Sequence, residues 1–349
     1  MTEWFADTTI AGQLRYQAEA CGHLGSPLYG ALLRDAVDDF EAGGPTWEVL
    51  HGREGEPGTS ALALRFMGAV NRLVLQGRAP DLAAVYDDPG PDEAAAWQAF
   101  RTVLERNVEE LRTLVDRPVQ TNEAGRSAAL LCGFLTVAAE TGLPLRLLEV
   151  GASAGLNLRW DRYRYLGADG FTWGPADSPV RIEFELRGGR FPVPTEIEVR
   201  ERHGCDSAPL DPADPEGRLT LLAYVWPDQR TRVERVRAAL AVAVAEPVSI
   251  DREGAATWAG RKLAEDSPGL ATVLYHSVVA QYLSEGELSE FEGHVREAGE
   301  RASAEAPLAW LRMEAAGKMA DLRLATWPGG EDRLLARVGY HGSPVELLP

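Results

Sequence analysis

One short run constrains the fold of this chain more than any other. Residues 145–150, LRLLEV, are almost continuously apolar, and the run GASAG follows at once from Gly151 to Gly155. An apolar run of this length is typical of a strand buried on both faces of a parallel sheet, and a glycine directly after it permits a tight turn. The sequence therefore predicts an α/β domain whose first strand is 145–150.

Strand-like and helical segments alternate after this strand, which is typical of βαβ units. The further strands are expected at 196–202, 247–250, 271–276 and 308–313, and the helices between them at 231–245 and 287–304. The tail, 321–340, instead predicts two strands joined by a turn at 328–332, an antiparallel hairpin. Residues 163–194, rich in Gly, Pro and aromatic residues, are expected to form an insertion over the site.

The first 140 residues show apolar positions at helical spacing and almost no strand-like alternation. Helices separated by Gly- and Pro-rich turns are expected at 9–24, 28–40, 60–75, 92–115 and 123–140. Because 349 residues exceed the usual size of one hydrophobic core, two domains are expected. We expect a helical lid or substrate domain at 1–140 and the sheet domain at 141–349.

Composition disfavours several classes of protein. The chain has 35 basic and 53 acidic residues, a net charge of -18, which disfavours binding to a phosphate backbone. No apolar run is long enough to span a membrane, and the first residues lack the features of a signal peptide, so a cytoplasmic protein is expected. The three cysteines are far apart and no metal-ligand spacing occurs, so neither a metal nor a disulfide framework is expected.

The run LLEVGASAGLN, residues 147–157, resembles motif I of class I S-adenosylmethionine (SAM) enzymes, where an acidic residue precedes three spaced small residues. In such a turn the small residues let the backbone approach the ligand, and the amides that open the next helix can bind the methionine carboxylate. The acidic residue would act on the ligand's ammonium. The cofactor positions that this resemblance implies are Glu149, Gly151, Ser153, Gly155 and Asn157.

Other interpretations of the same run remain open. A dinucleotide site would need glycine at 153 and 156, where the chain has Ser153 and Leu156. GASAG also matches GxSxG, the nucleophile elbow of α/β-hydrolases, with Ser153 as nucleophile. Its acid would be Asp228 or Asp251 and its base His276 or His341. No strands and no HGG[G] run precede the motif, so an esterase of the α/β-hydrolase type is kept only as an alternative. A further alternative is a glycine-rich turn that has a packing role alone.

Carboxylates follow the second and third expected strands. Class I SAM enzymes typically place one at the end of the second strand, where it accepts from the ribose hydroxyls, and Asp206 holds that position. Asp251 and Glu253 compete for the adenine amino group after the third strand. A turn residue or a surface charge is the alternative explanation for each.

The run from Ala271 to Leu283 resembles the fourth-strand motif of SAM enzymes, in which polar residues at the strand's carboxyl end face the donor methyl. His276 is predicted to act as general base, since an imidazole titrates near neutrality. Tyr275 is also predicted to be catalytic, and Ser277 to bind the cofactor. A histidine that ends a strand is alternatively a satisfied core residue.

Two polar runs interrupt apolar surroundings. In QTNEAGR, residues 120–126, Asn122 is predicted to be catalytic and Glu123 and Arg126 to bind substrate, although helix capping explains part of the run. In AYVWPDQR, residues 223–230, the predicted substrate or adenosine wall consists of Trp226, Asp228 and Gln229. The alternative for the second run is a packed aromatic at a helix start.

Together the runs QTNEAGR, LLEVGASAGLN, AYVWPDQ, LYHSVVAQYL and VGYHG are similar to one bacterial family known only as a domain of unknown function. Its members resemble class I methyltransferases with an added helical N-terminal region. The resemblance implies a mostly parallel seven-stranded sheet that ends in an antiparallel hairpin, SAM as cofactor, and methyl transfer to a small molecule. Transfer or cyclisation of the aminocarboxypropyl arm and SAM binding without turnover are the alternatives.

Overall fold

The structure is a computed structural model that describes residues 8–88, 92–192 and 197–348, and the chain divides into two compact units. The first unit is Met1–Thr121 with Pro215–Glu234, and the second is Asn122–Asp214 with Arg235–Pro349. The division therefore differs from the one expected near residue 140. The helix that follows Asn122 belongs with the sheet, whereas the chain returns to the helical unit in the middle of the βα series.

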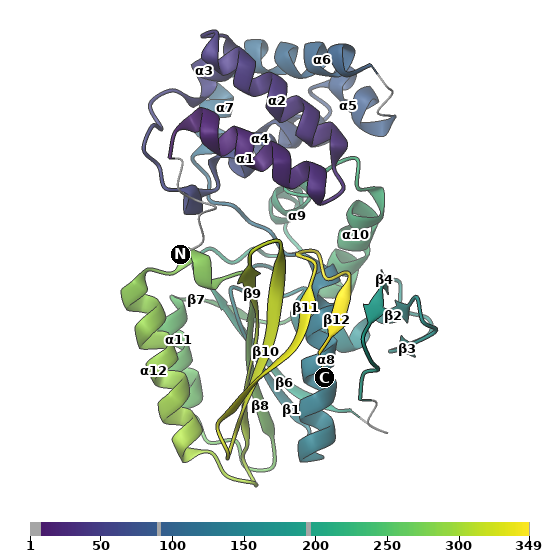
Figure 1. Ribbon diagram of the computed structural model, residues 1–349, viewed down its shortest axis with the longest axis vertical. Coiled ribbons are helices and arrows are strands. Elements are labelled where there is room, and N and C mark those ends of the chain that lie inside the picture. Colours follow the sequence, from purple (N-terminus) through teal and green to yellow (C-terminus); the bar gives the residue numbers. More distant parts are fainter. Residues whose placement is uncertain (1–7, 89–91, 193–196, 349) are drawn as a thin grey trace. The chain divides into compact units, whose positions relative to one another are not determined.

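The described part of the first unit is built from helices (Figure 1). They are α1 (Ile10–His23), α2 (Pro27–Glu41), α3 (Pro45–Leu50), the 3₁₀ helix η2 (Gly58–Ser60), α4 (Leu62–Leu75), α5 (Pro80–Asp87), α6 (Glu93–Arg106), α7 (Val108–Val115) and α9 (Pro215–Ala223). The helix expected at 92–115 is interrupted at Asn107, whose side chain donates to Val103 O at 2.8 Å. The short helices α3 and α5 were not predicted, although each begins at a proline.

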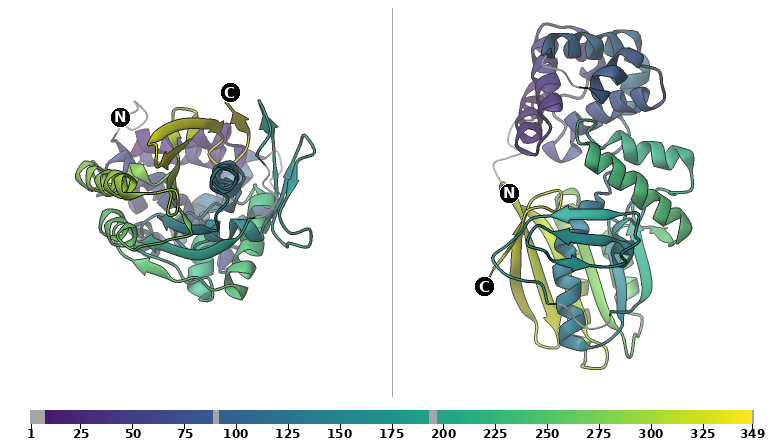
Figure 2. Two further views of the ribbon diagram at one scale, coloured as in Figure 1. Left: turned by 90° about the horizontal axis from the view of Figure 1, so that it is seen from below. Right: turned by 90° about the vertical axis from the view of Figure 1, so that its right-hand side faces the viewer.

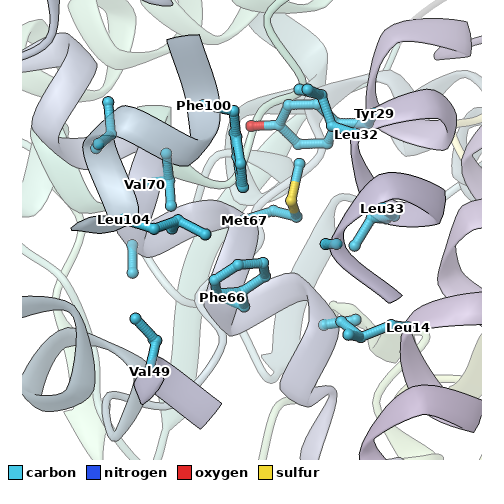
Figure 3. Packing of buried hydrophobic residues seen from close by; sticks show 14 of the residues in the cluster. Leu14, Tyr29, Leu32, Leu33, Val49, Phe66, Met67, Val70, Phe100 and Leu104 are labelled. Carbon is cyan, nitrogen blue, oxygen red and sulfur yellow. The ribbon is translucent and has the colours of Figure 1, made fainter. Parts of the chain in front are cut away.

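The core of the first unit forms around α4. Phe66 and Met67 of α4 are fully buried and lie among Leu14 of α1 and Phe100 of α6 (Figure 3). The rings of Phe66 and Phe100 meet edge to face, with centroids 5.8 Å apart. Periodic apolar positions on several helices thus meet in one core, as the spacing predicted.

The second unit contains a nine-stranded mixed sheet of order β5-β12-β11-β10-β9-β8-β1-β6-β7. Its strands are β1 (Leu145–Val150), β5 (Leu186–Arg187), β6 (Val199–Asp206), β7 (Ile250–Arg252), β8 (Ala271–Ser277), β9 (Leu308–Ala316), β10 (Met319–Trp327), β11 (Glu331–Val338) and β12 (Val345–Leu347). The expectation of seven strands was wrong, because β5 and β12 are only two and three residues long and carry no readable pattern.

The strands β7, β6, β1, β8 and β9 are parallel and follow the doubly wound order 3-2-1-4-5. The expected hairpin of β10 and β11 is confirmed by their antiparallel pairing. The third strand begins at Ile250 instead of ending there. The start expected for the second strand, at 196, lies outside the described residues.

The two faces of the sheet carry different helices. Residues that alternate along a strand point to opposite faces. Tyr275 packs on Phe134 of α8 (Ser127–Thr141), whereas its neighbour Leu274 shares a buried cluster with Trp258 of α11 (Ala255–Leu263) and Phe291 of α12 (Glu285–Arg301). Figure 1 shows α11 and α12 side by side, and the left view of Figure 2 looks along α8.

Within the expected insertion at 163–194, β5 pairs with β12 at the edge of the main sheet, and three further strands form a separate sheet of order β3-β2-β4. These strands are β2 (Arg164–Gly167), β3 (Thr172–Trp173) and β4 (Arg181–Phe184). Trp173 stacks on Trp160 at 5.1 Å between centroids, and Trp160 stacks on Phe134 at 4.5 Å. The insertion therefore supports the segment that follows the glycine motif, and residues 193–194 lie outside the described chain.

Candidate functional site

The site predicted from the glycine motif lies at the carboxyl ends of β1 and β8. These two strands are neighbours, and Glu149 is in register with Tyr275. In a sheet of order 3-2-1-4-5 the chain leaves the first strand toward one side and returns on the other, so the switch point lies between these two strands. Ligands of open α/β sheets bind outside the carboxyl ends at such a point.

The turn after β1 is left-handed at three positions. Gly151, Ser153 and Gly155 have φ angles of +69°, +53° and +68°. A Cβ added to Gly151 would lie 2.5 Å from Cγ2 of Val279, so glycine is required there by conformation and by space. Ser153 adopts the same region with a side chain, which is uncommon for a residue other than glycine.

The amides of this turn are partly engaged, which corrects one expectation. Ser153 N donates to Asp206 Oδ2 at 2.9 Å, and Leu156 N donates to Asn122 Oδ1 at 2.9 Å. The next element is a 3₁₀ helix, η4 (Asn157–Arg162), and not an α-helix. The motif predicts free amides at a helix start that can bind the carboxylate of a ligand. At Ser153 and Leu156 the amides are instead bonded to side chains of the protein.

Glu149 is the most unusual group of the site. Its side chain is buried at the end of β1, and burial raises the pKa of its carboxyl group to about 8. Its hydrogen-bond partners are the hydroxyl of Tyr275, which donates to Oε2 at 3.3 Å, and the amide side chain of Asn157. Burial outweighs these two hydrogen bonds and the charge of nearby Arg159, so near neutral pH the carboxyl group of Glu149 is largely protonated.

The side chain of Asn157 is buried, and its Oδ1 has no hydrogen-bond partner in the described structure. An unsatisfied buried acceptor is uncommon and calls for a donor. Asn157 was predicted to bind the cofactor as the last residue of the run that resembles motif I. In the structure its Oδ1 and the Glu149 carboxyl instead form a pair of acceptors.

Sequence reasoning missed Arg159 of η4. Its guanidinium is buried and donates to Gly155 O at 2.6 Å and to Glu246 O at 2.8 Å, and burial lowers its pKa. These bonds fix the carbonyl side of the glycine turn. The only signal for it was a charged residue inside the apolar run LNLRW.

His276 faces away from this site. Trp310 Nε1 donates to His276 Nε2 at 3.1 Å, so the ring proton is on Nδ1, which donates to Glu314 Oε1 at 2.6 Å. Phe291 of α12 covers the ring. Both nitrogens are therefore engaged on the face opposite Tyr275, and the imidazole has no lone pair for a substrate proton. The predicted general base has the geometry of a core residue.

The residues predicted near the start of α8 bind backbone. Glu123 Oε1 accepts from Gly125 N at 2.9 Å and lies 3.5 Å from Arg235 NH1. Arg126 donates to Ser277 O at 2.9 Å and to Tyr340 O at 3.1 Å. These contacts join the segment before α8 to the end of β8 and to the C-terminal segment. They place Arg126 and Ser277 at the predicted edge, with Ser277 contributing its carbonyl.

The two candidates for the adenine contact point toward α11. Asp251 Oδ2 accepts from Trp258 Nε1 at 2.8 Å and from Arg261 NH2 at 3.0 Å. Glu253 is paired with the same Arg261 at 2.5 Å. Asp206, by contrast, stays at the edge, where its oxygens accept from Ser153 N and Ala208 N. Of the three carboxylates, the structure brings only Asp206 to the glycine turn.

Trp226, Asp228 and Gln229 belong to the first unit. Asp228 accepts from Ser26 Oγ at 2.7 Å and from Leu28 N at 3.2 Å, at the start of α2. Gln229 Nε2 donates to Leu24 O at 2.6 Å, and Trp226 is part of the helical core. These contacts of the predicted wall are those of core packing and helix capping.

An open hollow of about 450 Å³ lies elsewhere in the second unit. It is lined by Leu166, Gly167, Ala168, Glu183, Phe184, Glu185 and Ser343. None of these residues belongs to the glycine motif.

The described residues contain no group of three or more His, Cys, Asp or Glu side chains placed to hold a metal ion. No helix among them has the length and apolar character needed to cross a membrane.

No curated protein and no solved structure matches the chain significantly. A family model does match, over residues 11–347, and its description is "Uncharacterized protein conserved in bacteria (DUF2332)". The match covers nearly the whole chain, so the protein belongs to this bacterial family.

Proposed function

We propose that this protein binds SAM at the carboxyl ends of β1 and β8 and transfers part of it, by default the methyl group, to a small molecule. The observation that carries the proposal is the buried carboxyl group of Glu149, next to a left-handed turn at the switch point of a doubly wound sheet. A carboxyl group that burial keeps largely protonated favours a cationic ligand group, which would restore its charge.

The polar groups at this place suit the methionine end of SAM. Glu149 and Asn157 Oδ1 supply two buried acceptors for an ammonium group. Asp206 is held beside the turn by Ser153 N, and each of its oxygens keeps a lone pair for a ribose hydroxyl. In this assignment Asp251 and Glu253 bind Arg261 and make no contact with adenine.

Bound SAM would supply an electrophilic carbon next to a sulfonium. The residues of the chain would orient the donor and keep water away, since the side chains of Glu149, Asn157 and Tyr275 are all buried. Tyr275 would hold the carboxylate through its hydroxyl, and Asn122 would hold the turn through Leu156 N. Neither these residues nor His276 is assigned a proton transfer.

Calorimetric titration tests the proposal directly. SAM and S-adenosylhomocysteine should bind with micromolar Kd, and NAD and ATP should not. Because the pKa of Glu149 is about 8, roughly nine-tenths of its carboxyl groups are protonated at pH 7. An ammonium bound against it should therefore release close to one proton per ligand, measured in buffers of different ionisation enthalpy.

The matched control is Glu140→Gln, which removes a carboxylate paired with Arg333 at the surface of the same unit. It should leave both affinity and proton release unchanged. Glu149→Gln should abolish the proton release and weaken binding. If the folded wild-type protein binds neither SAM nor S-adenosylhomocysteine, the proposal is refuted. If it binds them but transfers no group to any acceptor screened, the transferase part fails and the protein only binds SAM.

One observation favours the esterase alternative. Ser153 has φ +53°, and a nucleophile elbow holds its serine in a strained turn between strand and helix. Against it, β1 is the first strand of the chain's described part, and His276 and Asp251 are engaged with other side chains. A fluorophosphonate probe separates the two functions. If the probe labels the wild-type protein and not Ser153→Ala, Ser153 is a nucleophile. If the wild-type protein is not labelled, the esterase alternative is excluded.

A further inference from the structure

The loop that follows β8 is strained where it faces the glycine turn. Val278 has φ +57°, a conformation that is a genuine outlier for a β-branched residue. Such a conformation is energetically unfavourable and persists only where the surroundings enforce it. The loop continues into the 3₁₀ helix η5 (Ala280–Tyr282), where the side chain of Tyr282 is exposed.

Two groups of the next strand hold this conformation: Met313 O accepts from Val278 N at 2.8 Å, and a carboxylate binds the following amide. Glu314 of β9 accepts at Oε1 from Val279 N at 3.0 Å and from His276 Nδ1 at 2.6 Å. Trp310, four residues earlier on β9, donates to the other nitrogen of His276. The imidazole is thus bracketed by two residues of one neighbouring strand, and its donated proton fixes the Glu314 oxygen that holds the loop.

The loop in turn limits the space at the glycine turn. The side chain of Val279 lies so close to Gly151 that a Cβ there would be 2.5 Å from Cγ2. A shift of Val279 therefore changes the surface against which Gly151 is packed. The contacts form a continuous path from Trp310 through His276, Glu314 and Val279 to the turn.

We propose that Glu314 is a positioning residue of the ligand site: held by His276 and Trp310, it fixes the strained loop at Val279 against the glycine turn and thereby sets the affinity for the ligand. The ligand part of this inference rests on the proposed function. The structural part, that Glu314 holds the loop, does not. His276 acquires a role through Glu314 in place of the proton transfer predicted from its sequence position.

The test compares Glu314→Ala with Glu314→Gln in the full chain. The amide oxygen of glutamine can accept both bonds that Oε1 accepts, whereas alanine accepts none. Hydrogen exchange of a peptide covering residues 277–283 should accelerate roughly tenfold or more in the alanine variant, as expected for loss of bonds to a charged acceptor. S-adenosylhomocysteine should bind about tenfold more weakly to it. The glutamine variant should restore most of both.

Glu140→Ala serves as the control, because it removes an ion pair of the same unit far along α8 from the loop. Val279→Ala is the second variant: it keeps the backbone bond to Glu314 and removes the contact with Gly151. Val279→Ala should weaken S-adenosylhomocysteine binding several-fold without accelerating hydrogen exchange in residues 277–283. This variant tests the contact even if Glu314→Ala does not fold.

Unchanged exchange in a folded Glu314→Ala protein would overturn the inference, as would wild-type affinity of Val279→Ala. If the wild-type protein binds no sulfur ligand while Glu314→Ala accelerates exchange, the proposed function fails and the loop-holding role stands. The two failures are therefore distinguishable.

Discussion

The substitution Glu149→Gln changes one buried atom and separates the charge of this residue from its shape. Glutamine has the size of a protonated glutamic acid, and the environment of Glu149 raises its pKa from an ordinary 4.5 to about 8. Between these two values the unfolded chain releases the proton and the folded chain keeps it. The contribution of this proton to the free energy of unfolding of the wild-type protein is therefore fully present below pH 4.5 and is lost as the pH rises toward 8.

The magnitude follows from that difference in pKa. One unit corresponds to about 1.4 kcal/mol, so the loss approaches roughly 4–5 kcal/mol at and above pH 8. Between pH 5.5 and 7.5 the wild-type protein should lose roughly 2–3 kcal/mol through this group alone. Glutamine does not titrate, so the variant should gain that amount relative to wild type over the same interval.

Guanidinium unfolding of both proteins at pH 5.5 and 7.5, followed by tryptophan fluorescence, measures the change. Other titrating groups are shared, so they cancel in the difference between the proteins. Glu140→Gln, at an exposed ion pair, should show no comparable gain. A difference between Glu149→Gln and wild type that stays constant within about 0.5 kcal/mol over this range would refute the raised pKa, and with it the argument for a cation at this place.

Three further substitutions test the geometry of the site. Gly151→Ala should destabilise the protein by about 2 kcal/mol or more, because its Cβ meets Val279 at 2.5 Å; Gly142→Ala, with φ +65° and nothing within 4 Å, should cost only about 1 kcal/mol, and equal losses would contradict the contact. His276→Ala should cost roughly 2–4 kcal/mol in thermal or chemical unfolding, since it strands Trp310 Nε1 and Glu314; wild-type stability would speak against a core role. Asp228→Ala should lower stability by about 1–2 kcal/mol through the start of α2 and leave SAM affinity unchanged, whereas lost affinity at full stability would restore its predicted role in binding.

The strands that position the site could be predicted because they are buried on both faces. LRLLEV and ATVLYH are β1 and most of β8, and the runs of β9 and of the hairpin were also found in place. Such runs leave a continuous apolar pattern. The short strands β5 and β12 contribute too few residues to leave one, so the sheet was predicted with seven strands.

The site was predicted as a set of strand ends, and its side-chain directions were not. A polar residue at the end of a strand points to either face, and its partner is set by elements far away in the sequence. Glu314, 38 positions after His276, and Arg261, ten after Asp251, gave no local signal. The boundary between the units was missed for the same reason, since 215–234 lies inside the βα series and packs with helices near the start of the chain.

Strand alternation also bears on the choice between a SAM site and a nucleophile elbow. Both chemistries use small residues in a left-handed turn after a buried strand, so GASAG cannot separate them. The difference lies in what the neighbouring strand presents. Because Tyr275 packs on Phe134 and donates to Glu149, the next residue, His276, must face α11 and α12. A shift in the register of β8 by one residue would bring the imidazole to the other face of the sheet. It would also move every other buried side chain of the strand to the opposite face, away from its present partners. The register of β8 with β1 and β9 thus places a carboxyl group and a phenol beside the turn, which favours the proposed cationic ligand over activation of Ser153.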